Sequence, residues 1–198
     1  MINGKVHNFH AGGLYNGLIL LRDKETGSYW DHITGEAVHG PLKGTQLDIW
    51  GVQMTDRETA INEHGEIPFM TARPKWYQVG PLIFYYVFQF MYKGSVLNWT
   101  GFYPPGFTGT MSEVDDRLPE MMTGLGLFEN GSARFYPYSK LGTSPIVDTF
   151  NGRQVEVRIS EEDRIPLALY TDDGSRPMQL FSRWYGFSLT FPHTEIFE

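Results

Sequence analysis

The side chains best suited to chemistry lie together in one short stretch, residues 31–39. His32, Glu36 and His39 offer two imidazoles and a carboxylate, which are ligands that zinc, copper and iron accept. Three such ligands with an open coordination position would suit a catalytic divalent metal, and His10 could add another. The stretch therefore predicts a divalent metal or small-ligand site near the turn between Trp30 and His39.

The geometry of this site depends on the backbone around Gly35. On a strand, His32 and Glu36 share a face while His39 points to the opposite face. On a helix all three would share a face, but Gly35 disfavours a helix. A turn at Gly35 would bring the three side chains together.

A packing motif is the alternative interpretation of the same residues. Trp30 would then lie in the core, Thr34 and Glu36 would bond the turn backbone, and the histidines would cap loops. Both interpretations stay open at the level of the sequence, and with them the question of whether the chain is an enzyme.

Two other groups offer weaker catalytic chemistry. His193 stands two residues from Glu195 and could act as a general base, although a turn near the chain end explains the same residues. The pair Asp115-Asp116 could split its pKa values, but adjacent residues on an extended segment point apart. A solvated loop or an ion pair with Arg117 is the simpler expectation.

Aromatic residues make up 15% of the chain. A β-rich core with aromatic cross-strand pairs accounts for this content, and an aromatic-lined ligand pocket is the second interpretation. A third possibility is a structural domain whose aromatic middle segment forms a homo-oligomer interface. The residues expected around an aromatic pocket are Tyr29, Trp30, Trp76, Trp99 and Trp184.

Composition excludes several classes of function. The 198 residues include no cysteine, so disulfides, thiolate metal sites and cysteine nucleophiles are absent. A net charge of −7 without a Lys/Arg cluster argues against nucleic acid and anionic membrane surfaces, and favours solubility. The apolar run 81–92 is shorter than the ~20 residues of a membrane helix. Because no signal peptide is visible, we expect a cytoplasmic protein, or an exported one if the true start lies upstream.

The sequence pattern predicts that the elements positioning these side chains are mainly strands. Asn16-Gly17 is a strong two-residue hairpin signal, and Gly12-Gly13 suggests a further turn. Residues 55–58 resemble a capping box with Thr55 as the cap, which opens a short helix through about Asn62. The expected strands cover residues 5–9, 18–21, 28–30, 124–128, 132–136, 154–159 and 166–170.

This pattern predicts a mainly β fold with antiparallel sheets, arranged as a sandwich or partly open barrel with few short helices. We expect one domain over residues 1–198, with a first β-unit at 1–70, an insertion rich in aromatics, Pro and Gly at 71–117, and a second β-unit at 118–198. The two units could be pseudo-repeated halves. Asn3-Gly4 precedes Gly27-Ser28 at nearly the spacing by which Asn151-Gly152 precedes Gly174-Ser175.

Several of these motifs resemble a known family. An Asp-x-x-Thr-Gly-Ser-x-Trp turn at residues 23–30 is followed by Thr-Gly-Glu-Ala at 34–37. Together with the segments at 12–17 and 116–119 and the final Phe-Pro-His-Thr-Glu-Ile-Phe at 191–197, it is similar to the bacterial and archaeal family called domain of unknown function 3179.

The resemblance implies the placement of motifs but no activity. Members of that family usually carry a cysteine-containing strand before the Gly-Leu-Tyr segment, and that strand is absent here. We expect a small-molecule ligand to contact the shared turn and a distant tryptophan. The expected ligand contacts are Arg22, Asp23, Tyr29, Trp30, Thr34 and Trp184.

Overall fold

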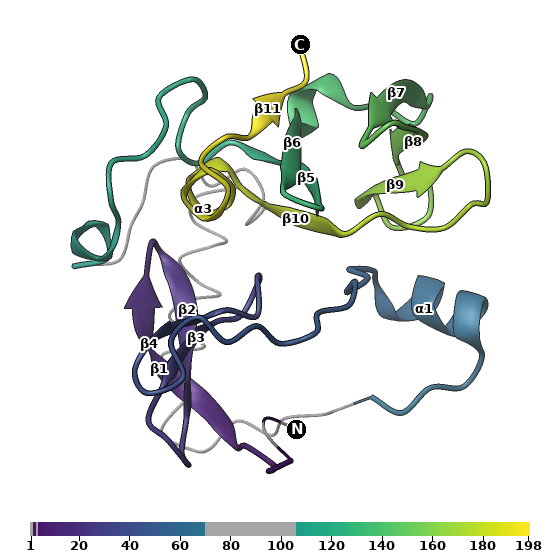
Figure 1. Cartoon of the computed structure of the whole chain (residues 1–198). Helices are drawn as coiled ribbons and strands as arrows, with labels where there is room; N and C mark the ends of the chain where they lie inside the picture. Colours follow the sequence, from purple (N-terminus) through teal and green to yellow (C-terminus); the bar gives the residue numbers. More distant parts are fainter. Residues whose placement is uncertain (1, 3, 70–105) are drawn as a thin grey trace, which may run out of the picture.

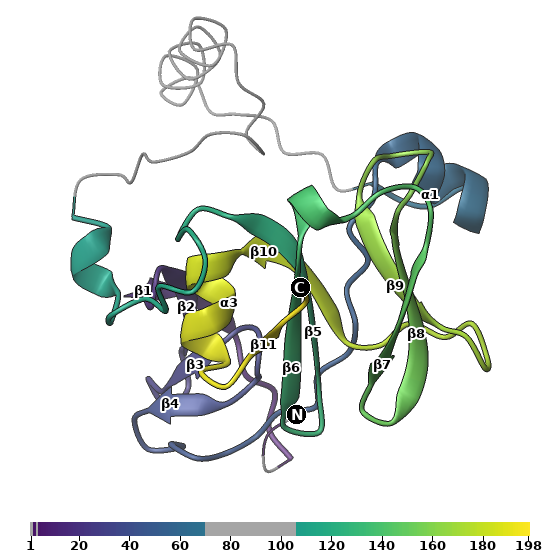
Figure 2. The same ribbon diagram turned by 90° about the horizontal axis from the view of Figure 1, so that it is seen from above.

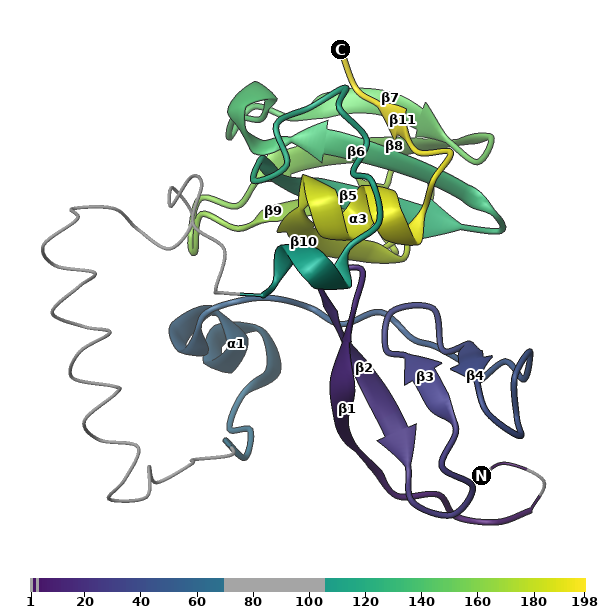
Figure 3. The same ribbon diagram turned by 90° about the vertical axis from the view of Figure 1, so that its left-hand side faces the viewer.

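The computed structural model of the chain describes residues 2, 4–69 and 106–198 and contains three β-sheets (Figure 1). A sheet from the N-terminal part lies apart from two sheets formed by the C-terminal part (Figure 3). The apolar run 81–92, Trp76 and Trp99 lie outside the described residues, as does most of the expected insertion at 71–117.

The N-terminal sheet is an antiparallel meander in the order β1-β2-β3-β4. The Asn16-Gly17 hairpin is confirmed, with φ of 52° and 71° at its two residues, as this turn type requires. Gly12-Gly13, expected as a turn, instead lies inside a strand, where the register shifts between residues 11 and 13. The strands are β1 (Phe9–Tyr15), β2 (Leu18–Asp23), β3 (Tyr29–Asp31) and β4 (Ala37–His39).

One face of this sheet is only partly covered. We expected residues 18–21 to form a buried strand, but Ile19 is 51% exposed. The covered face holds a small core of Trp30, Ile2 and Ala37, with Leu21 packed against it. An antiparallel sheet commonly buries one face only, which explains why a continuous apolar run is half exposed here.

The predicted helix is confirmed as α1 (Arg57–His64), but its cap differs from the expected one. Asp56, rather than Thr55, is the N-cap residue, and its side chain accepts a hydrogen bond from Thr59 N. The Thr55 hydroxyl instead donates to Asp163 Oδ2 at 2.7 Å, and so connects this segment to the C-terminal sheets.

The central sheet has the order β10-β5-β6-β11, and a third sheet has the order β7-β8-β9. All pairs in these sheets are antiparallel except β11 with β6, which is parallel. The strands are β5 (Thr123–Glu129), β6 (Ser132–Pro137), β7 (Ile146–Phe150), β8 (Arg153–Ile159), β9 (Pro166–Tyr170), β10 (Gln179–Arg183) and β11 (Glu195–Ile196). Two short 3-10 helices, η2 (Thr108–Thr110) and η3 (Tyr138–Lys140), lie before β5 and after β6.

Alternation along β5 places a different layer on each face of the central sheet. Leu125 and Leu127 belong to the main core shared with β7, β8 and β9. On the other face, a Cβ added at Gly126 would lie 2.0 Å from the Phe187 ring of helix α3 (Trp184–Thr190). Figure 2 shows α3 on one side of β5 and β6 and the third sheet on the other. The mainly β, sandwich-like prediction is confirmed, with α3 as an added layer.

The N-terminal sheet reaches this sandwich through the tip of its first hairpin. Asn16 N donates to Thr110 O at 2.7 Å, and Leu18 lies against Gly186 of α3. The expected domain boundaries and duplication stay predictions. In the described part of the chain, no helix is long and apolar enough to cross a membrane.

Candidate functional site

The turn between β2 and β3 is built around the carboxylate of Asp23, which is fully buried. Asp23 Oδ1 accepts from Thr26 N at 2.6 Å, and the Thr26 hydroxyl lies 2.8 Å from Oδ2. The indole Nε1 of Trp30 donates to Oδ2 at 2.8 Å. Gly27, with φ of 74°, closes the turn by donating its N–H to Asp23 O. The Asp-x-x-Thr-Gly-Ser-x-Trp motif is thus one hydrogen-bonded unit.

The surroundings keep Asp23 ionised. Burial alone raises the pKa of a carboxyl group, but hydrogen bonds to the charged form oppose it. Here the donors are the Trp30 indole and the Thr26 amide and hydroxyl. The His7 imidazole, 3.4 Å away, acts in the same direction and has the smallest effect on the pKa. Together these groups lower the pKa of Asp23 from 3.8 to about 2.

A second turn of the same kind follows at once, between β3 and β4. Asp31 Oδ1 accepts from Ile33 N at 2.7 Å and Thr34 N at 3.0 Å, and Gly35 N donates to Asp31 O. Gly35 has a φ of 73°. The turn residues line a cleft between the N-terminal sheet and the central sheet.

This cleft has a volume of about 560 Å³, within the usual range for small-molecule sites. One wall comes from the N-terminal sheet and its second turn, and another from the ends of β5 and β10. The extended segment 47–52 forms a third side. The lining residues are Phe9, Leu21, Trp30, Asp31, His32, Ile33, Gly35, Leu47, Asp48, Ile49, Trp50, Val52, Phe128, Met178, Gln179 and Leu180.

Few polar groups in the cleft remain available to a ligand. His32 Nδ1 lies 2.7 Å from Ile19 O. Because a carbonyl oxygen only accepts, Nδ1 carries a proton, and in the neutral imidazole Nε2 therefore keeps its lone pair. Asp48 is exposed and forms no hydrogen bond or ion pair with the described residues. The amide of Gln179 is already bonded at both ends to the Ala168 backbone.

The residues expected to hold a metal do not form one group. Among the described residues, no group of three or more potential metal ligands within 4.8 Å includes His32, Glu36, His39 or His10. His39 packs against the Tyr29 ring, with centroids 6.0 Å apart. In the strand register, His39 pairs with Tyr29 and Ala37 pairs with Trp30, with a shift between Tyr29 and Trp30.

The residues expected to bind a ligand lie in four places. Asp23 and Trp30 lie on the covered face of the N-terminal sheet, and Trp30 lines the cleft. The Arg22 guanidinium lies 5.4 Å from the Tyr29 ring centre.

The other two expected ligand contacts, Thr34 and Trp184, each take part in a hydrogen bond to a backbone carbonyl oxygen. The Thr34 carbonyl accepts from the Gln46 amide in the second turn. Trp184 is fully buried in the core beside α3, where its indole donates to Asp115 O at 2.7 Å.

The weaker catalytic candidates have structural partners. The Glu195 carboxylate pairs with Arg134, and His193 is exposed beside it in the sequence. Arg117 forms the expected ion pair with Asp115, at 2.6 Å, and also donates to Thr194 O. Asp115 and Asp116 line a separate open cavity of about 560 Å³, whereas His193 and Glu195 are not among its lining residues.

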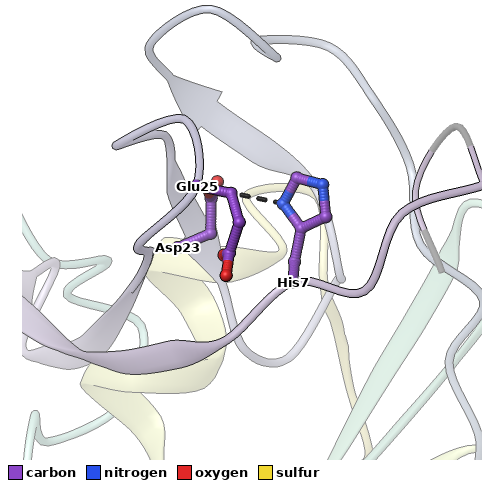
Figure 4. Close-up of side chains that lie close together, drawn as sticks. All are labelled: His7, Asp23 and Glu25. Carbon is purple, nitrogen blue, oxygen red and sulfur yellow. Dashed lines mark ion pairs between the residues drawn. The ribbon is translucent and has the colours of Figure 1, made fainter.

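Sequence reasoning missed the segment 47–52, which contributes the most exposed apolar surface of the cleft. Trp50 is 79% exposed and Val52 is 75% exposed. The available signal was the apolar spacing of Ile49, Trp50 and Val52 in a stretch without strand partners. It also missed a cluster at the open end of the β1–β2 hairpin, opposite the Asn16-Gly17 turn. There, ligand atoms of His7, Asp23 and Glu25 lie within 4.8 Å of one another (Figure 4).

Comparison with known proteins yields a family but no activity. No curated protein and no solved structure matches the chain at a significant level. The model of the family described as "Protein of unknown function (DUF3179)" matches residues 1–182. This match includes the N-terminal sheet and most of the C-terminal sheets, and it ends before the segment 191–197. The chain therefore belongs to the DUF3179 family.

Proposed function

We propose that this protein is a binding module for a flat, largely apolar organic molecule, held in the cleft between the N-terminal sheet and the central sheet. The observation that carries the proposal is the cleft of about 560 Å³, whose lining is mainly apolar and aromatic. A concave apolar site with a few polar groups that are free to bind a ligand is the usual form of a small-molecule pocket.

Exposed apolar surface supports the same conclusion. Trp50, Val52 and Ile49 expose 79%, 75% and 41% of their surface on one short segment. Single exposed apolar residues are ordinary, but several on one segment beside a cleft mark an interaction site. Trp50 in particular offers a rigid ring at a low cost in side-chain entropy.

The polar groups in the cleft define the preferred ligand further. An ionised Asp48 carboxylate accepts hydrogen bonds. In a neutral His32 whose proton is on Nδ1, Nε2 is a second acceptor. A ligand that carries an O–H or N–H group would satisfy them, and an anionic ligand would be repelled by Asp48. The proposed ligand class is therefore aromatic molecules with a hydrogen-bond donor, such as phenols and arylamines.

A matched pair of probes tests this class directly. We expect 2-naphthol to bind and to shift the NMR signals of Trp50 and of the neighbouring segment 47–52. The control, 2-methoxynaphthalene, has a similar ring but no donor, and we expect it to bind about tenfold more weakly, as for one net hydrogen bond. Equal affinities would remove the donor requirement, and the absence of shifts at the cleft would end the proposal.

Two substitutions locate the site. Trp50→Ala should weaken 2-naphthol binding about tenfold or more, as for an aromatic anchor residue. His32→Asn retains an N–H that can donate to Ile19 O but removes the acceptor at Nε2, so it should reduce the preference for 2-naphthol and leave only the part due to Asp48. His10→Asn is the matched control, since His10 lies outside the cleft. An identical effect of the two histidine substitutions would contradict the assignment.

A further inference from the structure

The open end of the β1–β2 hairpin contains a buried imidazole without a hydrogen-bond partner. The His7 side chain is 6% exposed. Its Nδ1 atom is buried and makes no hydrogen bond in the described structure. A buried polar nitrogen that is left unsatisfied costs about 1–3 kcal/mol, so such atoms are rare without a reason.

The Nδ1 atom faces the carboxylate of Asp23. Nδ1 lies 3.4 Å from Asp23 Oδ1, and Figure 4 shows the imidazole directed at this carboxylate. Two ligand atoms that are each about 2.1 Å from a tetrahedral zinc ion stand about 3.4 Å apart, given ordinary bond lengths to nitrogen and oxygen. The observed separation is long for a hydrogen bond and suits two ligands of one ion.

Asp23 retains an acceptor position on this side. A carboxylate has about four acceptor positions. Three donors reach Asp23 within the turn, namely the amide N–H and the single hydroxyl proton of Thr26, and the indole N–H of Trp30. His7 Nδ1 faces Oδ1, which lies 2.6 Å from Thr26 N and 2.9 Å from the Thr26 hydroxyl. Because that hydroxyl has one proton and also lies 2.8 Å from Oδ2, Oδ1 keeps one acceptor position when the proton is directed to Oδ2.

Glu25 supplies the third potential ligand. Its Oε2 accepts from Asn8 N at 2.8 Å and its Oε1 accepts from Asn8 Nδ2 at 2.8 Å. Each oxygen therefore has one protein donor and an unused lone pair. Ligand atoms of Glu25, His7 and Asp23 all lie within 4.8 Å of one another. Glu25 is exposed, so a small movement of its side chain can complete the group.

We infer that His7, Asp23 and Glu25 form a binding site for a divalent transition-metal cation, with zinc as the best fit. One imidazole and two carboxylates are a ligand set that zinc accepts, and three protein ligands leave a position for water. The hydrogen bonds from Trp30 and Thr26 orient the Asp23 carboxylate, in the manner of outer-shell partners at metal sites. The ion would connect the segment before β1 to the β2–β3 turn. This site does not depend on the cleft or on the proposed ligand.

Zinc binding by the full-length chain, purified without a histidine tag, tests the inference. We expect one zinc ion per chain in a competition titration against a chromogenic chelator. His7→Gln and Glu25→Gln should each weaken zinc binding by more than about tenfold, because even outer-shell partners are worth 10–100-fold in affinity. Asp23 is not a suitable first target, since its substitution disrupts the turn.

Matched controls separate a metal site from a simple ion pair. His10→Gln and Glu36→Gln remove the same side-chain types from outside the group and should leave the zinc affinity unchanged. Nitrogen NMR should show the zinc-dependent shift at His7 Nδ1. If His7→Gln lowers the urea midpoint but leaves zinc affinity unchanged, His7 and Asp23 form only an ion pair and the inference is wrong. Equal losses in the control variants would also overturn it.

Discussion

The turns at residues 23–27 and 31–35 share one sequence pattern, Asp-x-x-Thr-Gly, and one backbone path. In the first turn Gly27 N donates to Asp23 O at 3.1 Å, and in the second Gly35 N donates to Asp31 O at 3.0 Å. The two glycines have φ values of 74° and 73°. Local sequence thus produced the same turn twice within one sheet.

The two aspartates nevertheless have different surroundings. Asp23 is fully buried and accepts from a distant indole, whereas Asp31 is half-buried and caps only its own turn. The first turn faces the small N-terminal core and the proposed cation site. The second lines the cleft. The comparison teaches that a local pattern sets the shape of a turn, while its neighbours decide what the turn can do.

The largest expected difference between the turns concerns the two carboxylates. Asp23→Asn should lower the free energy of unfolding by about 3 kcal/mol, because it removes hydrogen bonds to a buried charge. Asp31→Asn should cost about 1 kcal/mol or less, since Asn also caps turns well. Urea unfolding followed by circular dichroism in metal-free buffer measures both. Equal costs would show that burial does not distinguish the turns.

The glycines should rank in the opposite order. A left-handed φ costs a non-glycine residue about 1–2 kcal/mol, so Gly27→Ala should lose about 1 kcal/mol. Its new Cβ would meet only the flexible end of Arg22, at 3.3 Å. At Gly35 the Cβ would lie 2.8 Å from Ile49 and 3.0 Å from the Leu47 carbonyl. Gly35→Ala should therefore cost about 2–3 kcal/mol, with overpacking added to the strain.

Thermal and urea unfolding of the two alanine variants provides the check. If Gly35→Ala is as stable as Gly27→Ala, the segment 47–52 moves away from the new Cβ at little cost in free energy. In that case 2-naphthol binding to the Gly35 variant should change little. If the segment is held firmly, the same variant should bind 2-naphthol less well.

The smallest expected effect is confined to acid pH. The folded pKa of Asp23 is about 2, below its ordinary value of 3.8. Its contribution to stability is therefore complete above the ordinary value and is lost as the pH falls through the folded value. As the pH falls from about 3.8 to about 2, the wild-type protein should lose the stability by which it exceeds Asp23→Asn. Urea midpoints measured along a pH series would show this loss. A constant advantage at all pH values would contradict the low folded pKa.

Local patterns in the sequence predicted much of the fold. Asn-Gly pairs adopt positive φ at both residues of a tight hairpin, as seen at Asn130-Gly131 and Asn151-Gly152. Alternating apolar residues correctly indicated β8 and β9, which bury one face. Helix α3 was missed, because its aromatic and β-branched residues favour strands. Close packing of Phe187 against Gly126 of β5 overrides that preference.

The candidate sites were predicted only in part. The motif around Asp23 and Trp30 was recognised from its spacing, and the stretch 31–39 does border the cleft through its first residues. The metal ligands expected on that stretch are not among the groups of potential ligands in the described residues. His7 could not be singled out, since its importance rests on burial and on facing Asp23.

The sequence by itself determined strands β2, β3, β5, β6, β8 and β9, the Asn-Gly hairpin turns and the repeated Asp-x-x-Thr-Gly unit, because these depend on backbone preferences and hydrogen bonds within a few residues. The strand expected at residues 5–9 instead begins at Phe9 and runs to Tyr15. Only the tertiary structure decided which aspartate is buried, where the segment 47–52 lies, and that His7 meets Asp23 and Glu25. These features join positions distant along the chain or in different elements, and the packing of whole sheets, rather than any local preference, brings them together.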